Sequence, residues 1–174
     1  MKRKTDKQNI NSSDIILMSI ETIIFFSQII ICILYYNYLG LDFLMYFGWF
    51  LLLMSFLLGW QGRAALEKKG KQGEGDKWIH TRKVVATGIY SVVRHPIYLS
   101  FALMSLTLVF LSQYWVNIIL GVIMLGLLYN DMRREEQDNI KKFGDKYLRY
   151  MKKVPRVNTV AGIIRLLNRN KITR

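Results

Sequence analysis

Cysteine and histidine are scarce in this chain, and several familiar catalytic motifs are missing. The 174 residues include one cysteine and two histidines. Cys32 has no partner for an intrachain disulfide, and His80 and His95 cannot by themselves form a metal site. The sequence also has no GxGxxG motif, no P-loop and no useful Ser/His/Asp spacing. We therefore expect no disulfide and no metal centre.

Acidic residues are also few, with 12 Asp and Glu against 25 Lys and Arg, and the formal net charge is +13. A basic chain can bind nucleic acid, but this one is 52% hydrophobic. Every Lys and Arg lies before Asp14, between Gln61 and Pro96, or after Asp131. Basic flanks of membrane spans explain the charge. We therefore expect the lipid bilayer as a partner and no nucleic acid.

Long apolar runs predict an all-α integral membrane protein with about four transmembrane helices. The runs are Ile15–Tyr36, Phe43–Trp60, Ile97–Leu111 and Trp115–Tyr129. The last two are short, because about fifteen helical residues cover ~22 Å of a hydrocarbon core of ~30 Å. They must borrow flanking residues, thin the bilayer or cross incompletely. The short turn Ser112–Tyr114 predicts that they form a helical hairpin. By the positive-inside rule, both termini and the central loop are expected in the cytoplasm.

The remaining segments are predicted to be cytoplasmic. Gly70–Asp76 is rich in glycine and charge and predicts a flexible turn, and Trp78–Ala86 is expected at the membrane surface. The fourth helix should continue past Glu136 until Gly144 breaks it. A short helix capped by Asp145 and ended by Pro155 should follow. The last segment predicts an interfacial amphipathic helix, from Val160, Ile163, Ile164 and Leu167 with Arg165, Arg169 and Lys171 between them.

A basic dipeptide stands directly before the third apolar run. Pro96 suits the first turn of a helix, so Arg94 and His95 should lie beside its free N–H groups and positive dipole end, where a carboxylate can bind. The hairpin should bring Glu135 and Glu136 next to them. Two interpretations are open here. The four residues form a ligand pocket, or an Arg–Glu pair ties two helix ends together and the glutamates mark a solvated face.

Two ordered motifs flank the hairpin. The first is Gly88-Ile89-Tyr90 followed after three residues by Arg94-His95-Pro96-Ile97-Tyr98. The second runs from Glu135-Glu136 through Phe143-Gly144, Tyr147 and Tyr150 to Val154-Pro155-Arg156. Together they resemble the signatures of the isoprenylcysteine carboxyl methyltransferase family and its phospholipid methyltransferase relatives. The resemblance covers roughly residues 78–160.

The resemblance implies S-adenosylmethionine as cofactor and a lipophilic methyl acceptor that enters from the membrane, such as an isoprenylcysteine carboxylate. The length of the chain predicts one integral membrane domain over residues 1–174, and the first two apolar runs predict an N-terminal transmembrane hairpin at 14–61. The resemblance implies a catalytic portion at 78–160. The small size of the chain resembles that of prokaryotic members, so we expect a prokaryotic cell membrane. The positions of Lys and Arg predict that the active site faces the cytoplasm.

The resemblance also implies roles for single residues. Arg94 and Glu136 are expected to be catalytic, with Arg94 orienting the acceptor carboxylate, which is ionised at pH 7 and needs no base. Cofactor binding is expected from Val84 and Val85 at the adenine, Gly88 at a close turn, Tyr90, His95, Pro96 and Tyr98 toward the methionine carboxylate, and Glu135 or Glu136 at the ribose or ammonium.

Two other functions are compatible with parts of the sequence. A membrane sterol or steroid reductase that uses NADPH has a similar Arg-His-Pro feature, although Asn is more common there at the position of Ile97. A membrane scaffold or transport subunit is favoured by Glu21 inside the first span, with Gln28 on the same helical face.

Overall fold

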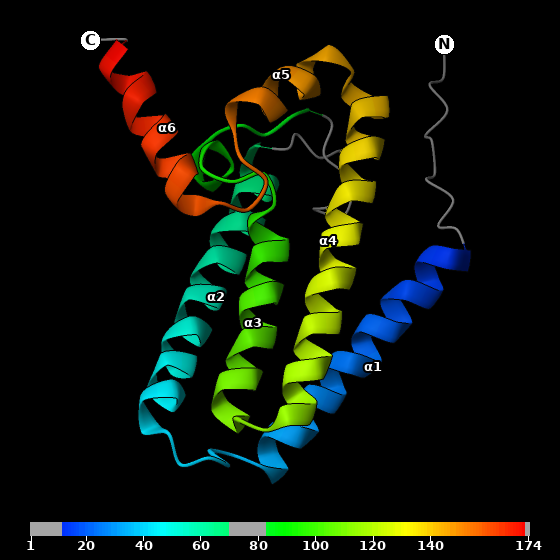
Figure 1. Cartoon of the computed structure of the whole chain (residues 1–174). Helices are drawn as coiled ribbons and strands as arrows, with labels where there is room; N and C mark the ends of the chain where they lie inside the picture. Colours follow the sequence, from blue (N-terminus) through cyan, green and yellow to red (C-terminus); the bar gives the residue numbers. More distant parts are fainter. Residues whose placement is uncertain (1–11, 70–82, 173–174) are drawn as a thin grey trace.

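The computed structural model describes residues 12–69 and 83–172, and these residues form helices and loops without a β-strand (Figure 1). The elements, in chain order, are α1 (Ser12–Leu34), α2 (Asp42–Lys69), the 3₁₀ turn η1 (Gly88–Ser91), α3 (Pro96–Ser112), α4 (Trp115–Phe143), α5 (Asp145–Lys153) and α6 (Thr159–Ile172). Helices α1 to α4 form an elongated bundle, and α5 and α6 lie at the end where α2 and α4 finish. The predicted all-α architecture is confirmed.

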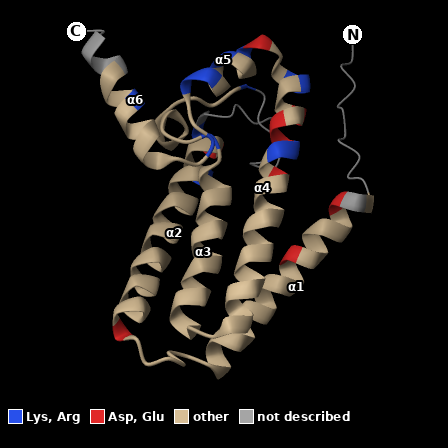
Figure 2. Ribbon diagram, viewed as in Figure 1, with Lys and Arg blue, Asp and Glu red and all other residues tan. Residues whose placement is uncertain are grey.

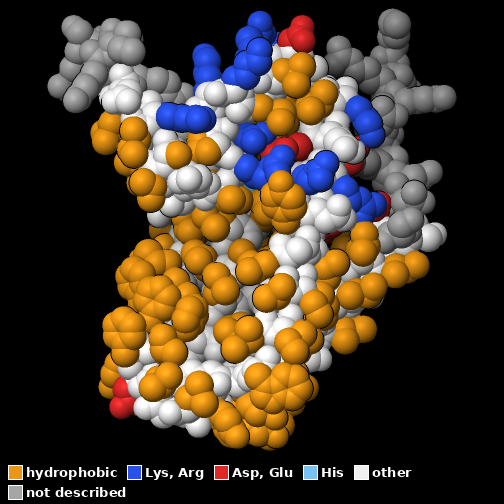
Figure 3. Space-filling view, viewed as in Figure 1, with side chains coloured by type: hydrophobic (Ala, Val, Ile, Leu, Met, Phe, Trp, Pro, Cys, Tyr) orange, Lys and Arg blue, Asp and Glu red, His pale blue; other side chains and the backbone are white. Residues whose placement is uncertain are grey.

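Three of the helices, α1, α2 and α4, are long and apolar enough to cross a membrane. Helix α3 has 17 residues and covers about 26 Å, so it is shorter than the hydrocarbon core, as predicted. Helix α4 has 29 residues, because it continues past Glu136 as a polar helix. This continuation was predicted and is confirmed. Hydrophobic side chains form a broad belt over the bundle, while the Lys and Arg of the described residues gather at one end (Figures 2 and 3).

Small residues on α2 allow α3 to pack closely against it. A Cβ atom built at Gly59 would lie 3.1 Å from Ser100 Oγ, and one at Gly62 would lie 2.9 Å from Ile97 Cγ1. The hydroxyl of Ser55 donates a hydrogen bond of 2.8 Å to the carbonyl of Ser100. Close backbone approach and such interhelical hydrogen bonds stabilise helix pairs in lipid, where the hydrophobic effect does not hold helices together.

A buried polar network joins α1 to the hairpin of α3 and α4. Gln28, Ser105 and Asn117 are fully buried. Ser105 Oγ donates to Gln28 Oε1 at 2.9 Å, and Asn117 Nδ2 donates to the Gln28 carbonyl at 3.3 Å. Gln28 therefore serves helix packing, which weakens the transport interpretation that the sequence offered for it. Glu21, seven residues earlier, interacts with the carboxyl group of Asp131 on α4.

The two loops at the opposite end of the bundle are hydrogen-bonded to each other. Gln113 adopts a left-handed conformation, with φ 54°, and forms the predicted turn between α3 and α4. Its Nε2 donates to Asn37 Oδ1 at 2.8 Å and to the Leu41 carbonyl at 2.9 Å, and its Oε1 accepts from the Leu41 N–H at 3.1 Å. These bonds align the hairpin with the loop between α1 and α2.

The short helices after the bundle differ from expectation at one point. Gly144, with φ 56°, lies between α4 and α5 and ends α4, as predicted. Asp145 does not cap the helix: it is the first helical residue, and Gly144 occupies the cap position without a side-chain hydrogen bond. A left-handed φ favours glycine there over a capping side chain. The predicted turn at 70–76 and the surface segment from Trp78 to Arg82 lie outside the described residues.

We predict that Gly59→Leu destabilises the bundle, because the larger side chain must push α3 away from α2. The expected loss in the free energy of unfolding is about 1–3 kcal/mol. Thermal unfolding of the purified protein in detergent measures it. Gly126→Leu is the matched control, since nothing lies within 4 Å of a Cβ at that position of α4. Equal unfolding temperatures for the two variants would contradict the packing argument.

Candidate functional site

Two segments far apart in the sequence are paired in front of α3. Pro96 is buried at the first turn of α3, as predicted, and Arg94 and His95 precede it. The Arg94 N–H donates to the Pro155 carbonyl at 3.0 Å, and the His95 N–H donates to the Arg156 carbonyl at 3.3 Å. The chain after α5 therefore lies alongside the basic dipeptide, a pairing that the sequence did not reveal.

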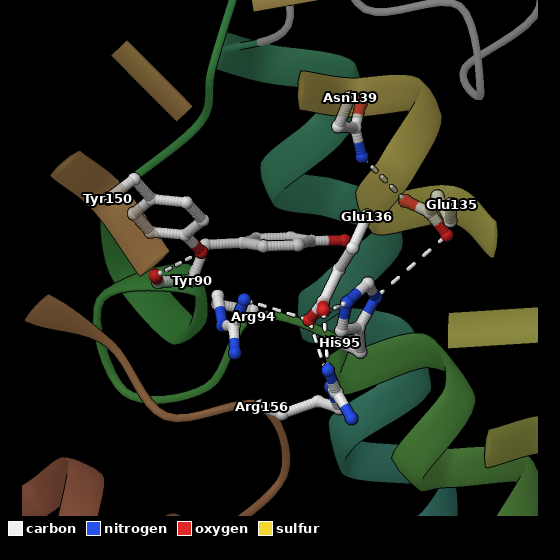
Figure 4. A network of polar contacts seen from close by, with 8 residues as sticks. All are labelled: Tyr90, Arg94, His95, Glu135, Glu136, Asn139, Tyr150 and Arg156. Carbon is white, nitrogen blue, oxygen red and sulfur yellow. Dashed lines mark hydrogen bonds and ion pairs between the residues drawn. The ribbon is translucent and has the colours of Figure 1, made fainter. Parts of the chain in front are cut away.

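Glu136 lies at the centre of a cluster of basic side chains (Figure 4). Its Oε1 is 2.8 Å from Arg94 Nη1 and 3.1 Å from His95 Nε2. Arg156 binds both carboxylate oxygens, with Nε donating to Oε1 at 3.0 Å and Nη2 donating to Oε2 at 2.6 Å. Glu136 is only 3% exposed. The predicted convergence of the two helix ends is thus confirmed, and the contacts of Glu136 match the interpretation of an Arg–Glu pair.

Arg156 is the residue of this cluster that was not proposed for the site. It belongs to the Val154-Pro155-Arg156 motif, which signalled its importance but not its partner. Its guanidinium also lies 5.0 Å from the centre of the Tyr129 ring. The hydrogen bond to Glu136 raises the pKa of Arg156 above its ordinary value, so this cation remains charged at every physiological pH.

Glu135 differs from its neighbour in both exposure and contacts. Its side chain is 45% exposed, and Oε2 lies 3.9 Å from His95 Nδ1. Asn139 Nδ2 donates a long hydrogen bond of 3.3 Å to Oε1. A carboxylate offers about four acceptor positions. Glu135 can therefore accept hydrogen bonds from a ligand, whereas the oxygens of Glu136 are already engaged by protein cations.

Arg94 has donors left for a ligand. Its side chain is 9% exposed, so it is largely removed from solvent. Although Nη1 forms an ion pair with Glu136, it is not aligned as a hydrogen bond, and neither Nε nor Nη1 has a hydrogen-bond partner. Unpaired buried donors cost free energy. A ligand that carries a carboxylate or another oxygen acceptor would satisfy them.

Buried tyrosines and apolar residues form a wall beside the charged cluster. Tyr150 donates a hydrogen bond of 2.7 Å to the Tyr90 carbonyl, and Tyr147 packs beside Tyr150. Burial raises the pKa of Tyr147 to about 12, and it also raises the pKa of Tyr90 and of Tyr150. These phenols are therefore neutral hydrogen-bonding groups near pH 7. Val84 packs against the hydrophobic cluster that includes Tyr147 and Tyr150.

Tyr98, Val85 and Gly88 are the remaining residues that the sequence predicted for cofactor binding. The ring of Tyr98 contacts the His95 ring edge-on at 5.6 Å between centres. Val85 is buried, and Gly88 has φ 64° at the start of η1, a conformation that favours glycine. Within the described ranges there is no group of three His, Cys, Asp or Glu that could hold a metal ion.

We predict opposite outcomes for the two adjacent glutamates in the ligand-free protein. Glu136→Gln removes the charge that compensates the basic side chains around it, so the free energy of unfolding should fall by about 3 kcal/mol. Glu135→Gln serves as the matched control and should change it by less than about 0.5 kcal/mol, because that side chain is half exposed. Thermal unfolding in detergent compares them. A stable Glu136→Gln variant would show that the cluster does not hold the segments together.

A comparison with protein-family models matched residues 43–146 to the family described as phospholipid methyltransferase. This range is more than half of the chain and runs from the start of α2 to the start of α5. It includes α2, in which no motif was recognised, and it ends before Arg156. No match was found among curated proteins or solved structures.

Proposed function

The chain belongs to the phospholipid methyltransferase family, and from this membership we propose that it is an S-adenosylmethionine-dependent membrane methyltransferase with a lipophilic acceptor. Methyltransferases of this family are membrane proteins that act on lipids, and they typically use this cofactor. The observation that carries the proposal is that Arg94 has a buried Nε without a hydrogen-bond partner and Glu135 has a half-exposed carboxylate, both at the polar end of apolar helices.

The residues of the site fit the parts of the cofactor. S-adenosylmethionine supplies an electrophilic methyl group, and the protein must hold its carboxylate, ammonium and ribose. The carboxylate would bind near His95 and the free N–H groups at the start of α3. Glu135 would accept hydrogen bonds from the ribose hydroxyls or the ammonium. The adenine would pack on the apolar side formed by Val84 and the neighbouring tyrosines.

Glu136 takes a different role from the one expected of it. We assign it as a positioning residue rather than a catalytic one, because its two oxygens are bound by Arg94, His95 and Arg156. The Glu136 carboxylate holds the guanidinium of Arg94 in position at the site. Methyl transfer is an in-line displacement, so correct placement of donor and acceptor supplies most of the rate.

Arg94 is the residue proposed to orient the acceptor. An isoprenylcysteine carboxylate or a related lipid with an anionic head would accept a hydrogen bond from Nε, which has no partner, and would share Nη1 with Glu136. Such a carboxylate is already ionised and needs no general base. The acceptor's tail would lie along the exposed apolar surface of the bundle (Figure 3). The segregation of Lys and Arg supports a cytoplasmic site and cytoplasmic termini.

We predict that Glu135→Gln weakens S-adenosylmethionine binding at least tenfold, or by about 1.4 kcal/mol. Isothermal titration calorimetry of the purified protein measures the affinity. Asp138→Asn is the matched control, since Asp138 is exposed and interacts only with Lys141 among the contacts described. Titration with NADPH in the same buffer should give no binding. An affinity within twofold of the wild type, or binding of NADPH instead, would overturn the proposed cofactor site or favour the reductase alternative.

We further predict that catalytic efficiency rises steeply with the length of the acceptor's hydrocarbon tail at a constant head group. Each buried methylene contributes about 0.8 kcal/mol. Arg94→Gln should abolish most of the activity toward carboxylate acceptors with little change in cofactor affinity, because Arg156 and His95 still bind Glu136. Radiometric methyl transfer to a series of acceptors tests both points. Equal activity with a short, water-soluble acceptor would contradict entry from the bilayer.

A further inference from the structure

Helix α6 carries an apolar face that no other described part of the chain covers. Four side chains lie on one side of the helix at spacings of three and four residues and are between 49% and 66% exposed, namely Val160, Ile163, Ile164 and Leu167. The adjacent side of α6, with the buried Gly162 and half-buried Leu166, faces the protein. An amphipathic helix with an exposed apolar stripe requires a partner.

The position of α6 is set by a close backbone contact. A Cβ atom at Gly162 would lie 2.0 Å from the carbonyl oxygen of Val92, so only glycine permits this approach. Asn158 begins the helix, because its Oδ1 accepts a hydrogen bond of 2.9 Å from the Ala161 N–H. The helix is therefore fixed against the loop that leads to Arg94, rather than being a loose tail.

The surroundings of α6 match a membrane surface. Hydrophobic side chains of α6 lie next to the apolar belt of the bundle and level with its charged end, while Lys and Arg lie beside and above them (Figure 3). Arg165 is exposed on α6, away from the apolar stripe. Basic residues next to an apolar stripe bind at the boundary between head groups and acyl chains, most strongly where the lipids are anionic.

We propose that α6 is an interfacial anchor that binds the surface of the bilayer through its apolar stripe and anionic lipid head groups through its basic residues. The occupant of the exposed face is thus lipid, and the charge of the face selects anionic lipid. Continuity with the membrane-facing belt favours this occupant over a second copy of the chain.

The anchor has a direct connection to the site. The segment that precedes α6 contains Pro155 and Arg156. Their carbonyl oxygens accept hydrogen bonds from the backbone N–H groups of Arg94 and His95. Binding of α6 to the surface therefore holds these two hydrogen-bonded segments at the level of the head groups. This consequence for methyl transfer rests on the proposed function, but surface binding itself does not.

Depth-dependent fluorescence tests the anchor in the full-length protein. In a Cys32→Ser background, an environment-sensitive fluorophore is attached through Leu167→Cys on the apolar stripe of α6. Lys152→Cys, on the exposed side of α5, is the matched control. The proteins are placed singly in phosphatidylcholine nanodiscs with or without phosphatidylglycerol, and brominated lipids serve as quenchers. We expect quenching and a blue shift at position 167, increased by phosphatidylglycerol, and neither at position 152.

A charge variant separates the electrostatic part. Arg165→Gln should weaken the binding of phosphatidylglycerol at α6 about fivefold, seen as a smaller phosphatidylglycerol-dependent increase in quenching at position 167, whereas Lys146→Gln in the first turn of α5 should not. Absence of quenching at position 167 would overturn the anchor. Quenching that is independent of phosphatidylglycerol would overturn selection by anionic lipid. Shielding that occurs only with two protein copies in each disc would identify a self-association surface instead. None of these readouts depends on methyl transfer.

Discussion

The buried carboxylate of Glu136 is the interaction on which the rest of the site depends. A charge with so little exposure is tolerated only when cations and hydrogen bonds compensate it. Arg94 comes from the loop before α3, and Arg156 comes from the segment after α5. One side chain therefore joins three parts of the chain, and the placement of any ligand between them depends on that carboxylate.

The difference in length between α3 and α4 creates the space for this cluster. The two helices leave the same turn, but α3 has 17 residues and α4 has 29. The last turns of α4 therefore continue beyond Pro96, level with the loop that carries Arg94 and His95. Close packing at Gly59 and Gly62 joins α3 to α2, and the buried amides of Gln28 and Asn117 join α4 to α1. The charged residues at the polar end can therefore form a site outside the apolar part of the bundle.

Adjacent residues with the same chemistry have different roles here. Successive positions on an α-helix are rotated by about 100°, so Glu135 and Glu136 cannot face the same surroundings. Which of them is buried depends on the rotation of α4 against α3, and the pattern Glu-Glu does not contain that information. The same is true of Arg156, whose partner lies twenty residues earlier in the sequence and is reached only because α5 turns the chain back.

The sequence by itself determined the helical class, the hairpin, the segregation of charge and the approximate meeting of Arg94 and His95 with the glutamates. These follow from local periodicity, from the length of apolar runs and from the brevity of one turn. The tertiary structure alone decided that Glu136 is buried among cations while Glu135 is half exposed, and that Arg156 completes the cluster. It also decided that α6 contacts the backbone of Val92 at Gly162. Those outcomes depend on the rotation and separation of packed helices, which are set by contacts between residues distant in the chain.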